Sequence, residues 1–250
     1  MVNTYLSFCK QHSLNAFPAT ESILMMFLAE KSTSTRAETL SLYLTALRDA
    51  HISRGLKWPG RSEWPRLQKL LEGAKRAGGK KAAPKRDPIT TEVLAKLKPH
   101  LDLDMAEDRT WWAAACLATY GLLRGAEFLK KRSADPPLLR GDLKLDATGA
   151  TLKLRRSKTD QEGKGKEVQY FQNGSGTCPI AALHSYLKAP PANSIETAPL
   201  LQRPSGAALD HGTFVKRLKL LAAAAGLGSC NFTAHSFRRG GATGLLQAGT

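Results

Sequence analysis

Hydrophobic residues recur every three or four positions through most of the first part of the chain, which predicts amphipathic helices. The predicted helices run over 20–30, 35–54 and 62–77, after a first helix that starts near Met1. Thr35 and Glu38 have the spacing of a capping box, in which each side chain satisfies a backbone donor of the other. Residues 1–77 are therefore expected to form a helical domain of about four helices.

A change of composition separates this region from the rest of the chain. Residues 73–88 combine Gly, Ala and Pro with six basic residues and no acidic residue before Asp87. Such a segment is typical of an extended, solvated linker, which we place at 78–88.

Helical patterns return after the linker and are interrupted once by a different period. The further helices are predicted at 90–100, 107–120, 178–188, 210–225 and 233–248, with one helical turn at 123–131. Residues 150–158 and 166–171 instead alternate around a polar, Gly-containing segment, which predicts an antiparallel hairpin. We therefore expect residues 89–250 to form a mainly α domain with a small antiparallel β-sheet.

The net charge narrows the possible partners. The chain carries 37 Lys and Arg against 21 Asp and Glu, a formal charge of +16, with a pI of about 9.9. Residues 1–88 hold fifteen basic and seven acidic residues, and 89–250 hold twenty-two and fourteen, so each part carries +8. Such an excess attracts polyanions, since each neutralised phosphate releases a counterion. The alternative to a polyanionic partner is that the positive charge serves only to keep the protein soluble.

The sequence shows no sign of a membrane, secreted, zinc-binding or disulfide-rich protein. No apolar run is long enough to suggest a membrane span, and the N-terminal residues do not resemble a signal peptide. The four cysteines have neither zinc-type spacing nor the pattern of a disulfide framework. A reduced, intracellular protein is the simplest interpretation.

Arg124 lies in the most apolar part of the chain, within the stretch YGLLRGAEFL. A guanidinium group keeps its proton, so a buried one needs an anion. Glu127, three residues further on, can provide it across one helical turn. Two interpretations remain open: a structural ion pair, or an arginine that Glu127 orients into a cleft.

A second group of cations occurs in the stretch TAHSFRRGGAT. His235 and Arg238 are three residues apart on a predicted helix and so share a face near its start, where Thr233 can cap it. Arg239 points elsewhere, towards solvent or a DNA backbone. The adjacent glycines 240–241 weaken a helix, which suggests that another element packs closely there. The alternative is a surface helix that is merely basic.

Lys158 lies in the hairpin stretch RRSKTDQ and on its own would be interpreted as a solvated lysine. Together with Arg124, His235 and Arg238 it forms a more specific pattern. An arginine after a Gly-Leu turn, a hairpin lysine and a His-x-x-Arg helix start, in that order, resemble the tyrosine recombinase (phage-integrase-like) family. The resemblance covers essentially the whole chain, including its N-terminal helices and basic linker. Phage integrases and recombinases of mobile elements are all possible kin. The histidine favours the recombinases over the type IB topoisomerases, which share the chemistry.

The resemblance implies a division of roles on double-stranded DNA, with no metal or cofactor. Arg124 and Arg238 would hold the oxygens of one phosphate, supported by Glu127. Lys158 would protonate the leaving 5′ oxygen and His235 would assist proton transfer. A tyrosine would form a 3′-phosphotyrosyl intermediate for integration or recombination, and copies would associate on paired sites. The further DNA-binding candidates are Arg48, Arg66, Lys69, Lys75, Arg76, Lys80, Lys81 and Arg239.

The sequence departs from the family where the nucleophile is expected. By the family layout that tyrosine would lie roughly thirty residues beyond the second arginine, whereas Thr250 is twelve residues beyond Arg238. None of the five tyrosines occupies a suitable place, so we expect an incomplete catalytic domain. Three hypotheses follow: a recombinase whose nucleophile segment is supplied elsewhere, a non-catalytic DNA-binding remnant or accessory protein of a mobile element, and an unrelated basic helical RNA-binding protein. The enzyme and the remnant would work in a compartment that contains DNA, the nucleus or the bacterial nucleoid.

Overall fold

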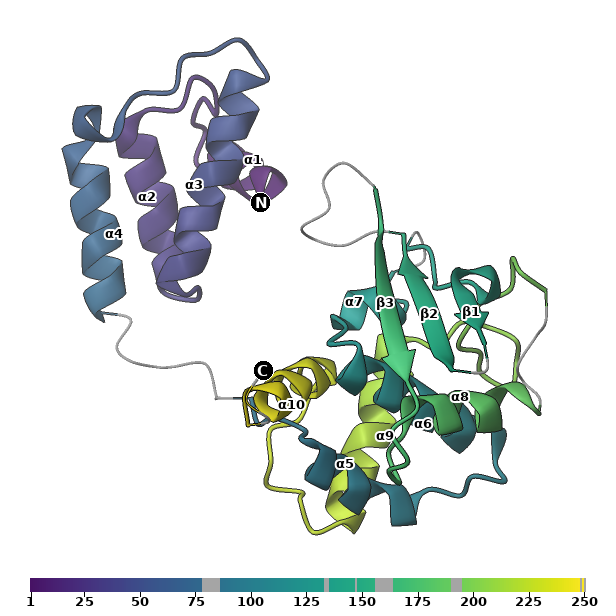
Figure 1. The fold of residues 1–250 in the computed structure, drawn as a ribbon. Coiled ribbons are helices and arrows are strands. Elements are labelled where there is room, and N and C mark those ends of the chain that lie inside the picture. Colours follow the sequence, from purple (N-terminus) through teal and green to yellow (C-terminus); the bar gives the residue numbers. More distant parts are fainter. Residues whose placement is uncertain are drawn as a thin grey trace. The chain divides into compact units, whose positions relative to one another are not determined.

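The chain folds into two compact units, Met1–Ala83 and Pro84–Thr250, in a computed structural model (Figure 1). The described residues are 1–77, 86–132, 135–146, 148–155, 164–189, 195–247 and 249. They are mostly helical with one small antiparallel sheet, which confirms the predicted fold class. No helix among them is long and apolar enough to cross a lipid bilayer.

The first unit is a cluster of helices. They are α1 (Val2–Gln11), α2 (Glu21–Ser32), α3 (Ala37–Ile52) and α4 (Pro65–Ala77), with a short 3-10 turn, η1 (Arg61–Glu63). Thr20 caps α2, because its hydroxyl accepts a hydrogen bond from the Ile23 N–H at 3.4 Å. The capping box predicted at Thr35 is wrong. Arg36 is the N-cap of α3 and forms no side-chain cap bond, so the helix begins one residue later than the box requires.

Aromatic side chains fill the core of this unit. Phe27 makes edge-to-face contacts with Tyr5, Phe8 and Tyr43, with ring centroids 5.2–5.3 Å apart. The buried His51 also contributes, because its Nε2 accepts a hydrogen bond from the Ala19 N–H at 2.9 Å. These contacts tie α1, α2 and α3 together, and Leu67 of α4 completes the core.

The second unit surrounds a buried helix. Its elements are α5 (Thr91–Leu97), η2 (Lys98–His100), α6 (Ala106–Tyr120), α7 (Gly125–Phe128), η3 (Arg140–Asp142), β1 (Leu143–Leu145), β2 (Gly149–Leu154), β3 (Lys166–Phe171), α8 (Pro179–Leu187), α9 (His211–Ala224) and α10 (Ala234–Gln247). Helix α6 packs against α8 and α10, and its Trp111 donates to the Phe214 carbonyl of α9 at 3.0 Å. Nearly every residue of α6 past Arg109 is buried, as its apolar sequence predicts.

The sheet has the order β1-β2-β3 and is antiparallel throughout (Figure 1). The predicted hairpin is present as β2 and β3, with Leu154 paired to Lys166 at its end. Strand β2 stops at Leu154, short of the predicted 158, and residues 156–163 lie outside the described part. Strand β1 was not predicted, because three residues are too few to show an alternating pattern.

The start of α10 packs closely on its neighbours, which confirms the prediction from its two glycines. A Cβ on Gly240 would overlap the Ile89 carbonyl and lie 2.7 Å from the Thr90 nitrogen, at the N-cap of α5. A Cβ on Gly241 would overlap the Thr119 carbonyl of α6. Only glycine permits this approach, and it fixes where the side chains of α10 point.

Candidate active site and DNA-binding surface

Arg124 is positioned by the turn between α6 and α7. Gly121 ends α6, and Leu122 takes a left-handed conformation with φ of 50° that redirects the chain. Arg124 is the N-cap of α7, and its backbone N–H donates to Glu127 Oε2 at 2.7 Å while its Nη1 donates to Oε1 at 3.0 Å. The predicted contact between Arg124 and Glu127 is present. The carboxylate is 6% exposed, and the arginine that it holds is 33% exposed.

Arg238 and His235 come to the same region from α10. Arg238 Nη1 donates to the Leu122 carbonyl at 2.6 Å, so the turn that presents Arg124 also holds Arg238. His235, one turn earlier, is exposed. The predicted cap by Thr233 is wrong: its hydroxyl has no partner among the described residues, and the Thr233 N–H donates instead to Ser236 Oγ at 3.0 Å.

The charges around His235 show how many cations gather here. Partial desolvation lowers the pKa of its imidazole, and nearby positive charges lower it further. These charges belong, in decreasing order of effect, to Arg86, Arg238, Arg239 and Arg124. A lowered pKa favours the neutral imidazole at pH 7, which is the form that can accept a proton.

Arg124 and Arg238 line one hollow of about 400 Å³ along the edge strand β3. Its lining residues are Tyr120, Gly121, Leu122, Arg124, Glu127, Leu154, Lys166, Glu167, Val168, Gln169 and Arg238. Lys158 lies outside the described residues. Within the described part, no group of three or more His, Cys, Asp or Glu side chains is placed to hold a metal ion.

The other DNA-binding candidates differ in what they contact. Arg48, Lys69, Lys75 and Arg76 are exposed on the first unit, and Lys80 and Lys81 lie outside the described residues. The Nη1 of Arg239, which was expected to face solvent or a DNA backbone, donates to the Arg86 carbonyl.

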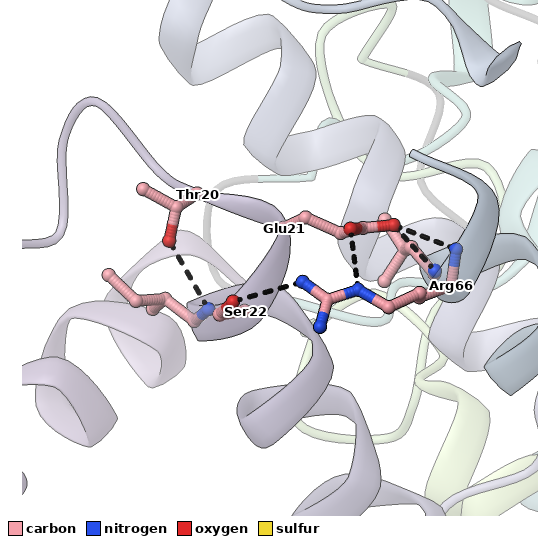
Figure 2. A network of polar contacts seen from close by, with 6 residues as sticks. Thr20, Glu21, Ser22 and Arg66 are labelled. Carbon is pink, nitrogen blue, oxygen red and sulfur yellow. Dashed lines mark hydrogen bonds and ion pairs between the residues drawn. The ribbon is translucent and has the colours of Figure 1, made fainter. Parts of the chain in front are cut away.

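Arg66 takes part in a network that joins two helices (Figure 2). Its Nε pairs with Glu21 Oε2 at 3.0 Å and its Nη2 donates to Ser22 Oγ at 3.3 Å. Glu21 Oε1 also accepts the backbone N–H groups of Arg66 and Leu67, and so caps α4 from the start of α2. The guanidinium of Arg66 thus has a structural role, although it remains largely exposed.

Sequence reasoning missed two cations at this site. The sequence places Arg86 only within the basic linker at 78–88 and Lys166 only within the strand predicted at 166–171. Arg86 acts on His235, and Lys166 lines the hollow with Arg124 and Arg238. A signal for Lys166 was available, because it pairs with Leu154 on the face that alternation assigns to the core. No local pattern marks Arg86.

The chain thus combines a helical unit with a second helical unit that carries a three-stranded sheet, and two arginines line a hollow beside that sheet. No protein-family model matches the chain. The chain is 23% identical to an integrase/recombinase xerD homolog of Selenomonas ruminantium over 253 residues, covering 97% of this chain and 70% of the relative. This likeness to a recombinase homolog agrees with the resemblance of the sequence to the tyrosine recombinase family.

Two solved structures are also similar. The post-cleavage complex of the XerH site-specific recombinase with a palindromic difH substrate aligns with a TM-score of 0.63 and 17% identity, covering 98% of this chain and 69% of that one. Its pre-cleavage complex with difH gives a TM-score of 0.48 and 16% identity over 86% of this chain and 60% of that one. The first likeness shows that the two chains share a fold.

Proposed function

We propose that this chain acts in site-specific DNA recombination or integration by tyrosine-type strand transfer. The observation that carries the proposal is the convergence of Arg124 and Arg238 on one hollow, from the turn before α7 and from α10. Two guanidinium groups that face one cavity suit the non-bridging oxygens of a phosphodiester, since each can donate two parallel hydrogen bonds. The relatives, a recombinase homolog and recombinase structures with DNA substrates, favour the same reading.

Each residue then has a defined task. Arg124, oriented by Glu127, and Arg238 stabilise the charge that develops on the phosphate in the transition state. The neutral imidazole of His235 can accept a proton next to it and release that proton again from the charged form. Lys158 is proposed to protonate the leaving 5′ oxygen, as the family resemblance implies.

We further infer that none of the five tyrosines is the nucleophile. Tyr5, Tyr170 and Tyr186 are at most 2% exposed, and each donates its hydroxyl proton to a backbone carbonyl. Tyr43 contacts Phe27 in the first unit. Tyr120 borders the hollow, but its hydroxyl pairs with Thr177 Oγ1 at 2.8 Å.

The attacking tyrosine must then come from outside residues 1–250, in the same polypeptide or in another subunit. We propose that residues 1–77 bind the DNA beside the cleavage site through the exposed cations of the first unit. Copies would associate on paired sites, in a compartment that contains DNA. A chain that never receives the tyrosine would instead be a DNA-binding accessory protein.

The test starts from DNA sites that the protein selects out of a random-sequence duplex pool. Residues 1–250 should bind these duplexes without forming a covalent adduct. A polypeptide in which translation continues through a downstream tyrosine should form a 3′-phosphotyrosyl adduct on a nicked duplex. Arg124→Gln and Arg238→Gln should abolish the adduct, whereas Lys219→Gln, on the exposed side of α9, should not.

The outcomes separate the alternatives. Absence of DNA binding at low salt would overturn the proposal altogether. Binding without an adduct in every extended version would leave the accessory protein. Tighter binding to single-stranded RNA than to any duplex DNA would favour an RNA-binding protein.

A further inference from the structure

The residues that enter the second unit are hydrogen bonded to the start of α10 and to Asn231 just before it. Asp87 N–H donates to the Asn231 carbonyl at 3.3 Å, and Asn231 N–H donates to Asp87 Oδ2 at 2.7 Å. Two residues later, Ile89 N–H donates to the Ser236 carbonyl at 2.9 Å, inside the first turn of α10. Residues 86–89 therefore lie against the start of the helix that carries His235 and Arg238.

This contact brings Arg86 and Arg239 to the same place. Arg239 Nη1 donates to the backbone carbonyl of Arg86, which draws the guanidinium of Arg239 onto the segment. The side chain of Arg86 is exposed, and its charge has the largest effect among those acting on the His235 imidazole. The positive charges of Arg86 and Arg239 thus act on His235 in addition to those of Arg238 and Arg124.

The charges in this cluster are poorly balanced. Glu127 is paired with Arg124, and Asp87 accepts a backbone N–H. Among the described residues, no carboxylate forms an ion pair with Arg86, Arg238 or Arg239. Arginines held together by backbone contacts repel one another, and a bound polyanion relieves that repulsion.

We propose that Arg86 and Arg239 bind a second phosphodiester of the DNA strand, next to the one held by Arg124 and Arg238. The proposal rests on the proposed function and adds to it a residue from the linker. Phosphate is the fitting ligand because a guanidinium group donates in a planar fork that matches two phosphate oxygens. Since the Arg86 segment is hydrogen bonded to α10, this second contact also ties the path of the DNA to the helix that carries His235.

The experiment compares Arg86→Gln, Arg86→Lys and Lys219→Gln by fluorescence anisotropy with a selected duplex over a series of salt concentrations. Arg86→Gln should weaken binding about tenfold near 0.1 M salt and make the log–log salt slope shallower by about 0.9, the value for one lost phosphate contact. Arg86→Lys should retain most of the slope, and Lys219→Gln should match the wild type. Glutamine leaves the Arg86 carbonyl in place, so the backbone contacts of the segment persist.

A second measurement checks that Arg86→Gln acts locally. In the free protein, NMR titration of the imidazole should show a higher pKa for His235 in Arg86→Gln, because one nearby positive charge is gone. If Arg86→Gln binds DNA like Lys219→Gln while Arg238→Gln binds more weakly, the second phosphate site is refuted and the proposed function stands. If none of these proteins binds duplex DNA, the proposed function fails as well.

Discussion

Replacing Gly240 by alanine perturbs the packing that positions the candidate site. The new Cβ would overlap the Ile89 carbonyl and lie 2.7 Å from the Thr90 nitrogen, whereas ordinary contact begins near 3.4 Å. Both neighbours are backbone atoms, and Ile89 N–H is itself bonded to the Ser236 carbonyl. The clash can be relieved only if α10 moves away from residues 89–90, and that movement shifts His235 and Arg238.

The magnitude follows from two opposing effects. Alanine in place of a helical glycine gains about 0.5–1 kcal/mol from helix propensity. Overpacking a tight contact costs about 1–3 kcal/mol, and a backbone neighbour places this case at the upper end. We expect a net loss of about 2 kcal/mol for Gly240→Ala. Gly244→Ala, in the same helix with nothing within 4 Å of its Cβ, should show only the gain.

Urea unfolding followed by tryptophan fluorescence measures the difference. Trp111 and Trp112 lie in the core of the second unit, and Trp58 and Trp64 lie in the first, so a transition that Gly240→Ala leaves unchanged serves as an internal control. With a slope near 2 kcal/mol/M, the midpoint of the second unit should fall by about 1 M in Gly240→Ala and rise slightly in Gly244→Ala. Equal or greater stability of Gly240→Ala would refute the close packing of α10.

Three further predictions concern single groups. His235 has a lowered pKa in the folded protein, so the unfolded chain binds more protons at acidic pH. The free energy of unfolding should therefore fall as pH drops below about 6.5. The difference between the urea midpoints at about pH 7.5 and 5.5 should be smaller in His235→Gln than in the wild type. Asp108→Ala should cost about 3 kcal/mol, because it leaves Arg217 without the carboxylate that it contacts at 2.7 and 2.5 Å, and thermal unfolding would show this loss. His51→Leu should cost about 2 kcal/mol, because the Ala19 N–H loses its buried acceptor; if denaturant titration of the first unit shows no loss, that bond does not stabilise it.

The elements that were predicted well are those whose signal is local and long. The apolar run of α6 and the alternating residues of β2 and β3 specify their own structure. Capping at Thr35 and Thr233 failed for a different reason. A cap depends on where a helix begins to within one residue, and at both sites neighbouring backbone contacts decide that point.

In the candidate site, too, the contacts between residues close in the sequence could be predicted and those between distant residues could not. The contact of Arg124 with Glu127 could be predicted because it spans three residues of one helical turn. The two glycines of α10 predict that some element packs closely against this helix, because glycines inside a helix otherwise only reduce its stability. The sequence does not show that residues 89–90 are that element.

Nothing in the local sequence indicates that Arg86 belongs to the site. Its position depends on hydrogen bonds between segments that are about 145 residues apart in the sequence. A linker rich in lysine and arginine reads as uniformly solvated, so one arginine that is fixed by tertiary contacts is indistinguishable from its neighbours. Composition therefore identifies the kind of partner, a polyanion, while the tertiary contacts single out which cation can meet a particular phosphate. On this reasoning, removing the charge of Arg86 should have a larger effect on DNA affinity than removing that of an exposed lysine elsewhere on the unit.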